Sequence, residues 1–447
     1  MEHDLGMEKV NRLLWRLSVP AILGMLSSAI FNIVDRIFVG KINPYALTAV
    51  GITMPIQILQ MAFVLLIGIG SSALISLKLG EGEKEEAEDL LYLASKYIIG
   101  FLIVFAAIFL VFLNPILTGL GISEEVLPYA KEYIVIIIVG SIIGIPGYCL
   151  NNSLRSIGQA KTSMKIIIVT SIMNMILDPI LIFGFDLGIK GAAIGTVLSQ
   201  MTLTIYVYYI FLTRQDFMIH LKKRQVKKER ELAKALIKMG SPSFFVQILA
   251  TGVNLYMNTS LLHYGTDLDV AAVTIISSIF SFYHMVVTGI VQGNNAICGY
   301  NWGAKQYGRV RSSLLLSLLY AGILSTVLFL LVQFFPHGIV DLFTKQEELR
   351  DVAARGIRLY LAMLPLVGLQ TISSQYYQAV GAARRSSALS FLRYGVIVVP
   401  AIMVFAPQYG VQGIYASNAI SDGIASVIAI AYIIHEIRKL RQLELMF

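Results

Sequence analysis

The chain has 447 residues, of which 56% are hydrophobic and only 14% charged, and its mean hydropathy is +0.73. These values exclude a soluble globular protein, and apolar runs longer than about 18 residues indicate an all-α integral membrane protein. The formal net charge of +8 would suggest a nucleic-acid partner for a soluble protein, but in a membrane protein Lys and Arg residues first report topology.

Twelve apolar spans are predicted, each long enough to cross about 30 Å of hydrocarbon at about 1.5 Å per residue. The first six lie at residues 17–39, 50–76, 92–113, 133–154, 164–184 and 188–212. The other six lie at residues 241–263, 270–300, 312–335, 357–380, 389–406 and 413–434. Because the number is even, both termini are expected on one side of the membrane.

Lys and Arg residues gather on the side that holds the termini. In this interpretation 27 of the 35 fall there, and Arg384, Arg385 and Arg393 are counted among them as loop residues. Positively charged loops remain in the cytoplasm, so both termini are predicted to be cytoplasmic. We expect a multi-pass protein of the cell membrane, inner or plasma, whose net charge reflects topology rather than nucleic-acid binding.

The two halves of the chain repeat one another with an offset of 222 or 223 residues. Matching pairs include Pro20 and Pro242, Asn32 and Asn254, Gly80 and Gly303, Gly158 and Gly381, and Gly188 and Gly410. Six spans return the chain to its starting side, so the halves are predicted to be parallel six-helix bundles with a transport path between them. The expected domains are an N-lobe at 1–212, a solvated basic cytoplasmic linker at 213–240, and a C-lobe at 241–447.

The repeat retains the prolines of the fifth and eleventh spans but not the acids of the first half. Pro179 and Pro400, like Asp178 and Val399, match to within one residue of this offset, and Asp35 matches Met257. Each proline is expected to bend its helix and to free a carbonyl. A carboxylate at membrane depth costs about 2.5 to 3.5 kcal/mol, so acids that the other half does without indicate function rather than packing.

Four polar residues of the first half lie at similar depth. At about 1.5 Å per residue, Asp35, Asp178 and Thr196 lie roughly 6, 9 and 12 Å below the outer ends of their spans. Asn174 precedes Asp178 by one turn and shares its helix face. Two carboxylates, an amide oxygen and a hydroxyl are hard ligands suited to Na⁺, and the carboxylates alone could hold H⁺.

An alternative interpretation assigns these residues local structural roles. Asp35 would pair with Arg36 near the surface, while Asn174 and Thr196 would satisfy nearby backbone groups. Helix neighbours point about 100° apart, which argues against an ion pair between residues 35 and 36.

The second half offers weaker candidates for substrate contact. Asp422 lies mid-span in the last helix, opposite Gln200 in the repeat, and could meet a cationic substrate or a neighbouring polar partner. His284 lies among aromatic and Met residues that could line an adaptable drug surface. Gln292 and Asn295 make the eighth span more suited to facing a cavity than most.

Five segments carry a recognisable pattern: NIVDRIFVG from Asn32, SLRSIGQAK from Ser153, MNMILDPILIFG from Met173, GIKGAAIGT from Gly188 and GYNWGAKQ from Gly299. In order and spacing they resemble the multidrug and toxic compound extrusion (MATE) transporters, over essentially the whole chain. The resemblance implies a V-shaped pair of six-helix bundles that exports organic cations or other amphipathic drugs in exchange for Na⁺ or H⁺.

The resemblance also implies where the coupling ion binds. The family's N-lobe cation site falls on Asp35, Asn174, Asp178 and Thr196, the set already reached from depth. The stretch 244–254 contains no acid, so the chain departs from the branch that has one in the seventh span. It therefore matches the branch whose coupling acids lie in the N-lobe. We expect a monomer in contact with membrane lipid that needs no cofactor besides its coupling ion.

Two other functions, a lipid-linked saccharide flippase and a membrane enzyme, are alternatives to efflux by alternating access. A flippase for a lipid-linked saccharide would need Arg or Lys deep in the cleft to meet phosphate, whereas the deep charges are predicted to be Asp35, Asp178 and Asp422. A membrane enzyme would need a nucleophile with a base, or a metal set, and the spans contain no such motif. Cys149 and Cys298 lack metal-site spacing and are interpreted as packing residues, so no enzyme activity is predicted.

Overall fold

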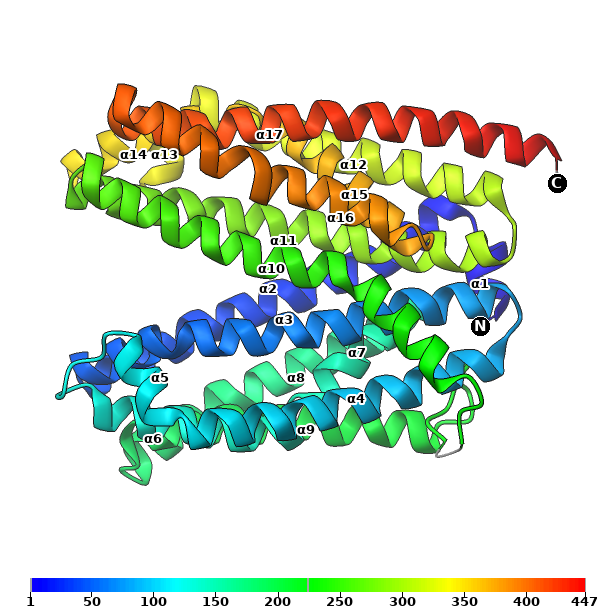
Figure 1. Cartoon of the computed structure of the whole chain (residues 1–447), viewed down its shortest axis with the longest axis horizontal. Coiled ribbons are helices and arrows are strands. Elements are labelled where there is room, and N and C mark those ends of the chain that lie inside the picture. Colours follow the sequence, from blue (N-terminus) through cyan, green and yellow to red (C-terminus); the bar gives the residue numbers. More distant parts are fainter. Residues whose placement is uncertain (1, 223–224, 447) are drawn as a thin grey trace. The chain divides into compact units, whose positions relative to one another are not determined.

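The structure is a computed structural model that describes residues 2–222 and 225–446, and all regular structure within these ranges is helical (Figure 1). A helix satisfies its own backbone hydrogen bonds, which is what a bilayer interior demands. The chain forms two compact units. Unit 1 consists of Val19–Gly240 and the residues before Gly6, and unit 2 consists of Gly6–Ser18 and the residues from Ser241 onward.

The helices of the first half begin and end where proline and glycine dictate. Asn43 caps α3, because its side-chain oxygen accepts the Ala46 backbone N–H at 2.7 Å. The fourth predicted span is divided into two helices before Pro146, which has no backbone N–H to donate. The elements are α1 (Glu2–Met7), α2 (Val10–Ile42), α3 (Pro44–Gly80), α4 (Lys84–Val111), α5 (Leu113–Gly119), α6 (Leu127–Gly144), α7 (Pro146–Ser156), α8 (Ala160–Pro179), the π-helix η1 (Ile180–Gly184) and α9 (Gly188–Thr213).

The helices of the second half follow the same order of long spans and short breaks. Thr266 and Asp269 form a reciprocal capping box at the start of α11. The elements are α10 (Glu229–Tyr264), α11 (Asp267–Gly303), α12 (Tyr307–Phe334), α13 (Pro336–Val340), α14 (Glu347–Tyr360), α15 (Leu364–Ala379), α16 (Ala383–Phe391), the π-helix η2 (Leu392–Ile397) and α17 (Val398–Met446).

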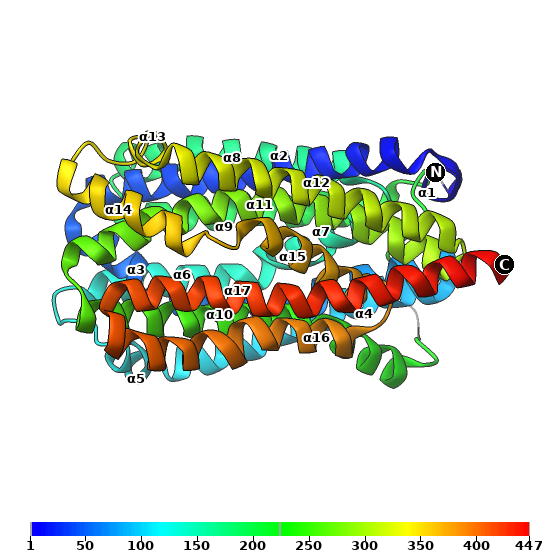
Figure 2. The ribbon, with the colours of Figure 1, turned by 90° about the horizontal axis from the view of Figure 1, so that it is seen from above.

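The number of spans agrees with the prediction once two bent segments are counted correctly. Ten helices in the described ranges are long and apolar enough to cross a membrane, and the pair α14 and α15, bent by 53°, makes an eleventh. Helix α17 contains two helices that meet at Gly410, where φ is 58°. Its orange and red runs lie side by side in both views (Figures 1 and 2). Counting this hairpin as two spans gives twelve.

Small residues bring the helices of unit 1 close together. A Cβ atom added at Gly140 would lie 2.3 Å from the side chain of Val197, and one at Gly147 would lie 2.3 Å from the Cα of Thr204. The Thr204 hydroxyl also accepts the Gly147 backbone N–H at 3.0 Å. Helices α6, α7 and α9 therefore pack backbone against backbone, as membrane helices do where hydrophobic burial cannot drive association.

The sequence repeat is visible in the backbone. Gly158 and its repeat counterpart Gly381 have φ values of 82° and 87°. At the next turn along each half, Gly188 and its counterpart Gly410 have φ values of 53° and 58°. These left-handed conformations favour glycine because it has no Cβ. Equivalent turns of the two halves therefore use the same residue for the same reason.

The first helix of each half begins in the unit built from the other half. Residues Gly6–Ser18, which include the start of α2, belong to unit 2, and the start of α10 up to Gly240 belongs to unit 1. In unit 2, a Cβ on Gly293 would lie 2.3 Å from the Ser18 hydroxyl. In unit 1, a Cβ on Gly240 would lie 1.7 Å from the Leu66 carbonyl oxygen. Ser18 and Gly240 are matched positions of the repeat, so the exchange is reciprocal.

The stretch 213–240, predicted as a solvated linker, packs against unit 1 along part of its length. Phe217, Met218 and Ile219 are buried. The His220 backbone N–H donates at 3.2 Å to the buried carboxylate of Glu88 on α4. Apolar burial therefore holds residues 217–219 to the bundle, although the stretch is basic overall.

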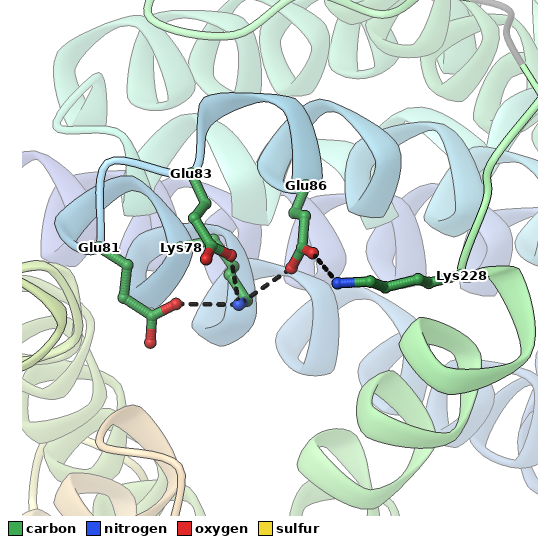
Figure 3. Close-up of polar contacts among 5 residues, drawn as sticks. All are labelled: Lys78, Glu81, Glu83, Glu86 and Lys228. Carbon is green, nitrogen blue, oxygen red and sulfur yellow. Dashed lines mark hydrogen bonds and ion pairs between the residues drawn. The ribbon is translucent and has the colours of Figure 1, made fainter.

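Ion pairs fasten the end of this stretch. The Lys228 ammonium lies 2.9 Å from Glu86, whose second oxygen lies 2.9 Å from Lys78 (Figure 3). Lys78 also contacts Glu81 at 2.9 Å and Glu83 at 2.6 Å. The hydrogen bond to Glu86 raises the pKa of Lys228. The network joins the end of α3 and the start of α4 to the segment that leads into α10.

We predict that Lys228→Gln loosens the connector without unfolding the bundle, because the carboxylate of Glu86 loses one of its two cations. Chymotryptic cleavage after Phe217 or Leu221 should become roughly two- to fivefold faster. Lys227→Gln is the matched control, since it removes the same charge from an exposed neighbouring position. Equal cleavage rates in the two variants would contradict the anchoring role.

Candidate functional site

Three of the four predicted site residues form one cluster in unit 1. Asn174 and Asp178 lie one turn apart on α8 and are both buried, and the Asn174 side-chain amide donates to Asp178 Oδ1 at 3.1 Å. Asp35 of α2 joins them, because its carboxyl group makes a hydrogen-bond contact with that of Asp178. Side chains from the first and fifth predicted spans thus lie against one another in unit 1.

The cluster has more oxygen atoms than donors. Asp35 Oδ1, Asn174 Oδ1 and Asp178 Oδ2 are buried and have no hydrogen-bond partner among the described residues. If both carboxyl groups are ionised, they have no proton to share and repel one another, because they are in contact. A proton or a cation between them removes that repulsion and also satisfies the remaining oxygens. The geometry is thus suited to a single exchangeable positive charge.

The local sequence explains why the helix changes shape beside the acids. Pro179 has no backbone N–H and cannot continue the α-helical pattern. The next residues form the π-helix η1, in which the Phe185 N–H donates to the Ile180 carbonyl at 2.9 Å. Helical breaks of this kind are frequent at functional sites.

Gly195 on α9 is a site residue that the sequence analysis missed. A Cβ at this position would lie 2.5 Å from Asp178 Oδ1 and 3.7 Å from the Asn174 amide nitrogen. Thr196, the fourth predicted residue, is half-buried at the next position of α9. A glycine inside a helix lowers the stability of that helix, so its presence in a predicted span was a signal that another side chain approaches the backbone there.

Tyr133 of α6 and Gln57 of α3 also border the cluster and were not predicted. Their side chains share a hydrogen bond, and the Tyr133 hydroxyl lies close enough to interact electrostatically with Asp35 and Asp178. Tyr133 is buried. The sequence assigned it only as the first residue of a span, because an aromatic residue at a span end is usually a packing or interfacial residue.

Arg36 does not form the ion pair with Asp35 that the alternative interpretation predicted. Its Nη2 atom lies 3.6 Å from Met54 Sδ, and the ion pairs found among the described residues do not include one between residues 35 and 36. The helical rotation between neighbours accounts for this separation.

In unit 2 the structure corrects the treatment of Arg393. This residue was counted with a cytoplasmic loop, but it lies in η2 and is buried, with its Nε atom 2.7 Å from Asp422 Oδ1. Its partner was out of reach of sequence analysis because Asp422 follows 29 residues later on another helix. Asp422 therefore meets a resident cation, which is the polar-partner alternative rather than a free contact for substrate.

The remaining candidates of unit 2 are only partly brought together. The ring of His284 lies 6.1 Å from the ring of Phe280 in a tilted arrangement, and the Phe280 ring also lies 5.9 Å from the Arg393 guanidinium. The Nδ1 atom of His284 lies 3.3 Å from the Thr288 hydroxyl. Gln292 and Asn295 follow two to three turns later on α11, roughly 12 to 16 Å along the helix axis.

The positions in unit 2 that match the acids of unit 1 belong to its apolar core. Met257, the counterpart of Asp35, is buried among aliphatic and aromatic residues that include Val398, and Val399 packs against the same cluster. Within the described ranges, no group of three or more His, Cys, Asp or Glu side chains is arranged to hold a metal ion. Unit 2 therefore has apolar residues at the positions where unit 1 has the Asp35–Asp178 pair.

The chain is similar to known membrane proteins over nearly its full length. The family model MatE matches residues 20–180 and again 242–404, which reproduces the internal repeat. "Multidrug export protein MepA" of Staphylococcus aureus (strain N315) is 26% identical over 433 residues, covering 96% of this chain and 94% of that protein. The protein of the same name from Staphylococcus saprophyticus is 26% identical over 424 residues, covering 94% and 93%.

Solved structures share the fold at lower identity. A structure of MATE in complex with MaL6 has a TM-score of 0.92 at 22% identity and covers 98% of this chain and 99% of that chain. A MOP superfamily transporter from Pyrococcus furiosus, described as having a binding pocket of reverse polarity, has a TM-score of 0.91 at 22% identity, with 98% of each chain covered. Since the family model matches both halves and the relatives align end to end, the chain belongs to the MatE family, that of the multidrug and toxic compound extrusion transporters.

Proposed function

We propose that the protein exports cationic or amphipathic organic compounds by exchanging them for Na⁺ or H⁺ at the Asp35–Asp178 cluster. It is a multi-pass membrane protein and a multidrug efflux transporter of the MatE family. The single observation that carries the coupling proposal is the contact of the Asp35 and Asp178 carboxyl groups, each of which has a buried oxygen without a hydrogen-bond partner among the described residues. Such a pair is far more stable with one positive charge bound between the two carboxyl groups than with both groups ionised and no charge bound.

The exchange follows from the charge of the cluster. When the cluster holds a proton or Na⁺, its negative charge is offset and an organic cation loses its electrostatic attraction to unit 1. When the ion leaves, the acids attract a cationic compound, so ion and cargo compete for one state of the protein. Thr196 is proposed as a further oxygen ligand, reached by a side-chain rotation at its half-buried position beside Gly195.

The cargo surface is proposed to include His284, Gln292 and Asn295 of α11. Asn295 Oδ1 is buried and has no hydrogen-bond partner within the described ranges, so it can receive a donor from a bound compound. The aromatic ring of Phe280 beside His284 offers an apolar face. Asp422 is left out of this surface because Arg393 already occupies its carboxylate.

A flippase for lipid-linked saccharides remains the weaker proposal, although one premise against it was wrong. A basic residue does lie deep in the spans, namely Arg393. Its guanidinium is neutralised by Asp422, and its Nη1 atom donates a hydrogen bond to the Gln370 side-chain oxygen at 3.3 Å. It therefore offers little free charge to a phosphate, and cationic cargo fits better. We propose transport rather than enzymatic catalysis, by a monomer in the cell membrane with both termini in the cytoplasm.

Asp35→Asn and Asp178→Asn should each lower efflux of the cationic dye ethidium at least tenfold in cells that express the folded protein. Each substitution removes one of the two carboxylates whose mutual repulsion favours an exchangeable positive charge between them. Asp186→Asn is the matched control, because Asp186 is exposed just beyond η1 and Asn tolerates its positive φ of 53°. Normal efflux by either cluster variant would overturn the site assignment.

Proteoliposomes should identify the coupling ion. We expect ethidium movement to respond to an imposed pH gradient or to an imposed Na⁺ gradient, and Asp178→Asn to respond to neither. Transport at the same rate with both gradients absent would exclude ion exchange while leaving efflux itself intact.

Gly195→Ala should weaken ion coupling without removing either acid. The added methyl group would press on Asp178 Oδ1 and displace the carboxyl group from Asp35. We expect the concentration of coupling ion needed for half-maximal transport to rise about tenfold, as small misplacements of site groups commonly cause. Gly100→Ala is the control, because a Cβ there meets no atom within 4 Å. Equal behaviour of the two variants would rule out the positioning role of Gly195.

A further inference from the structure

Arg393 and Asp422 form a buried ion pair between two helices of unit 2. The Nε atom of Arg393 donates to Asp422 Oδ1 at 2.7 Å, and the two side chains are only 7% and 5% exposed. The Ser421 hydroxyl donates to the Arg393 backbone carbonyl at 2.9 Å, which ties η2 to α17. A charged pair this deep costs desolvation energy that its mutual attraction only partly returns, so stability alone is a poor reason for it.

The guanidinium group is surrounded as a bound organic cation would be. Its centre lies 4.9 Å from the ring of Tyr394 and 5.9 Å from the ring of Phe280. The side-chain oxygen of Gln370 accepts from Nη1 at 3.3 Å. One carboxylate, one amide oxygen and two aromatic rings are the groups that recognise a planar or compact cation.

The repeat places this pair on the spans that match α8 and α9, which contribute Asn174, Asp178 and Gly195 to the coupling cluster of unit 1. With the offset of 222 that relates Gly188 to Gly410, Arg393 matches Ser171 and Asp422 matches Gln200. Ser171 precedes Asn174 by one turn on α8, and Gln200 follows Gly195 on α9. Both units therefore bury an acid between their fifth and sixth spans. In unit 1 the described side chains leave the acids short of positive charge, and in unit 2 the chain itself supplies it.

We propose that Arg393 is a tethered cation, which occupies beside Asp422 the place that a mobile inorganic or organic cation would otherwise take and so confines ion exchange to unit 1. The part of the proposal that concerns unit 1 rests on the proposed function. Cation binding at Asp422 after the removal of Arg393 does not. Arg393 thus sets how many positive charges the protein can bind. Its removal should create a second cation site rather than merely remove a contact.

The test compares Arg393→Ala with the double variant Arg393→Ala/Asp422→Asn. Both lose the same ring contacts, so their difference isolates the unpaired carboxylate. All proteins carry Asp178→Asn, which removes the coupling pair of unit 1, so a failure of the proposed function cannot imitate the result. The thermal unfolding midpoint is measured in detergent with millimolar guanidinium or Na⁺, and the chloride of the bulky, hydrophilic cation N-methyl-D-glucamine holds the ionic strength constant.

We expect guanidinium or Na⁺ to raise the midpoint of Arg393→Ala by roughly 3 °C at about ten times its dissociation constant. The parent and the double variant should not respond. A folded Arg393→Ala protein that neither cation stabilises would overturn the proposal, as would equal stabilisation of the double variant.

Failure of Arg393→Ala to fold still gives a decisive comparison. Replacing Asp422 by Asn removes the uncompensated charge, so the double variant should be recovered as monodisperse protein in at least several-fold higher yield. A double variant that is recovered no better than Arg393→Ala would mean that Arg393 acts through packing, and the proposal would be wrong.

Discussion

The cost of an uncompensated charge in a low-dielectric interior is the constraint on which the rest of this structure depends. The same constraint makes the chain helical, since a bilayer leaves no water to satisfy backbone groups. It also limits where a carboxylate can be buried and what must accompany it. A deep acid is therefore informative only together with its counter-charge, and the two units of this protein differ in the source of that charge.

Unit 1 brings Asp35 and Asp178 together and surrounds them with too few donors for both to be ionised comfortably. Unit 2 has an apolar core at the matched positions and pairs its own acid with Arg393 one helix away. The scaffold, including the left-handed glycines at equivalent turns, is common to both units. Two copies of one architecture have thus diverged in electrostatics while retaining their backbone, and this divergence is the basis for the proposed single ion site.

Most of the fold and half of the site could be predicted, because both rest on periodicity. Span lengths follow from apolar runs, and Asn174 and Asp178 meet because residues four apart share a helix face. Gly195 escaped prediction because the helices are apolar on most sides, so the sequence does not say which face of α9 approaches α8. Arg393 was misplaced because a basic residue near a predicted span end usually belongs to a loop, and its partner lies on a different helix. Contacts between helices depend on their rotation, which one sequence without related sequences leaves undetermined.

The reciprocal exchange of helix beginnings bears on how such a protein could arise. Each unit contains the start of the other half's first helix, with Ser18 against Gly293 in one and Gly240 against Leu66 in the other. A six-helix ancestor with this property would have been complete only as a symmetric dimer that traded those segments. Fusion of two gene copies then needed only a connector, because the exchange of segments already existed. Once fused, the copies were free to differ, and a mutation such as one that introduces a buried arginine could alter one half without being imposed on the other.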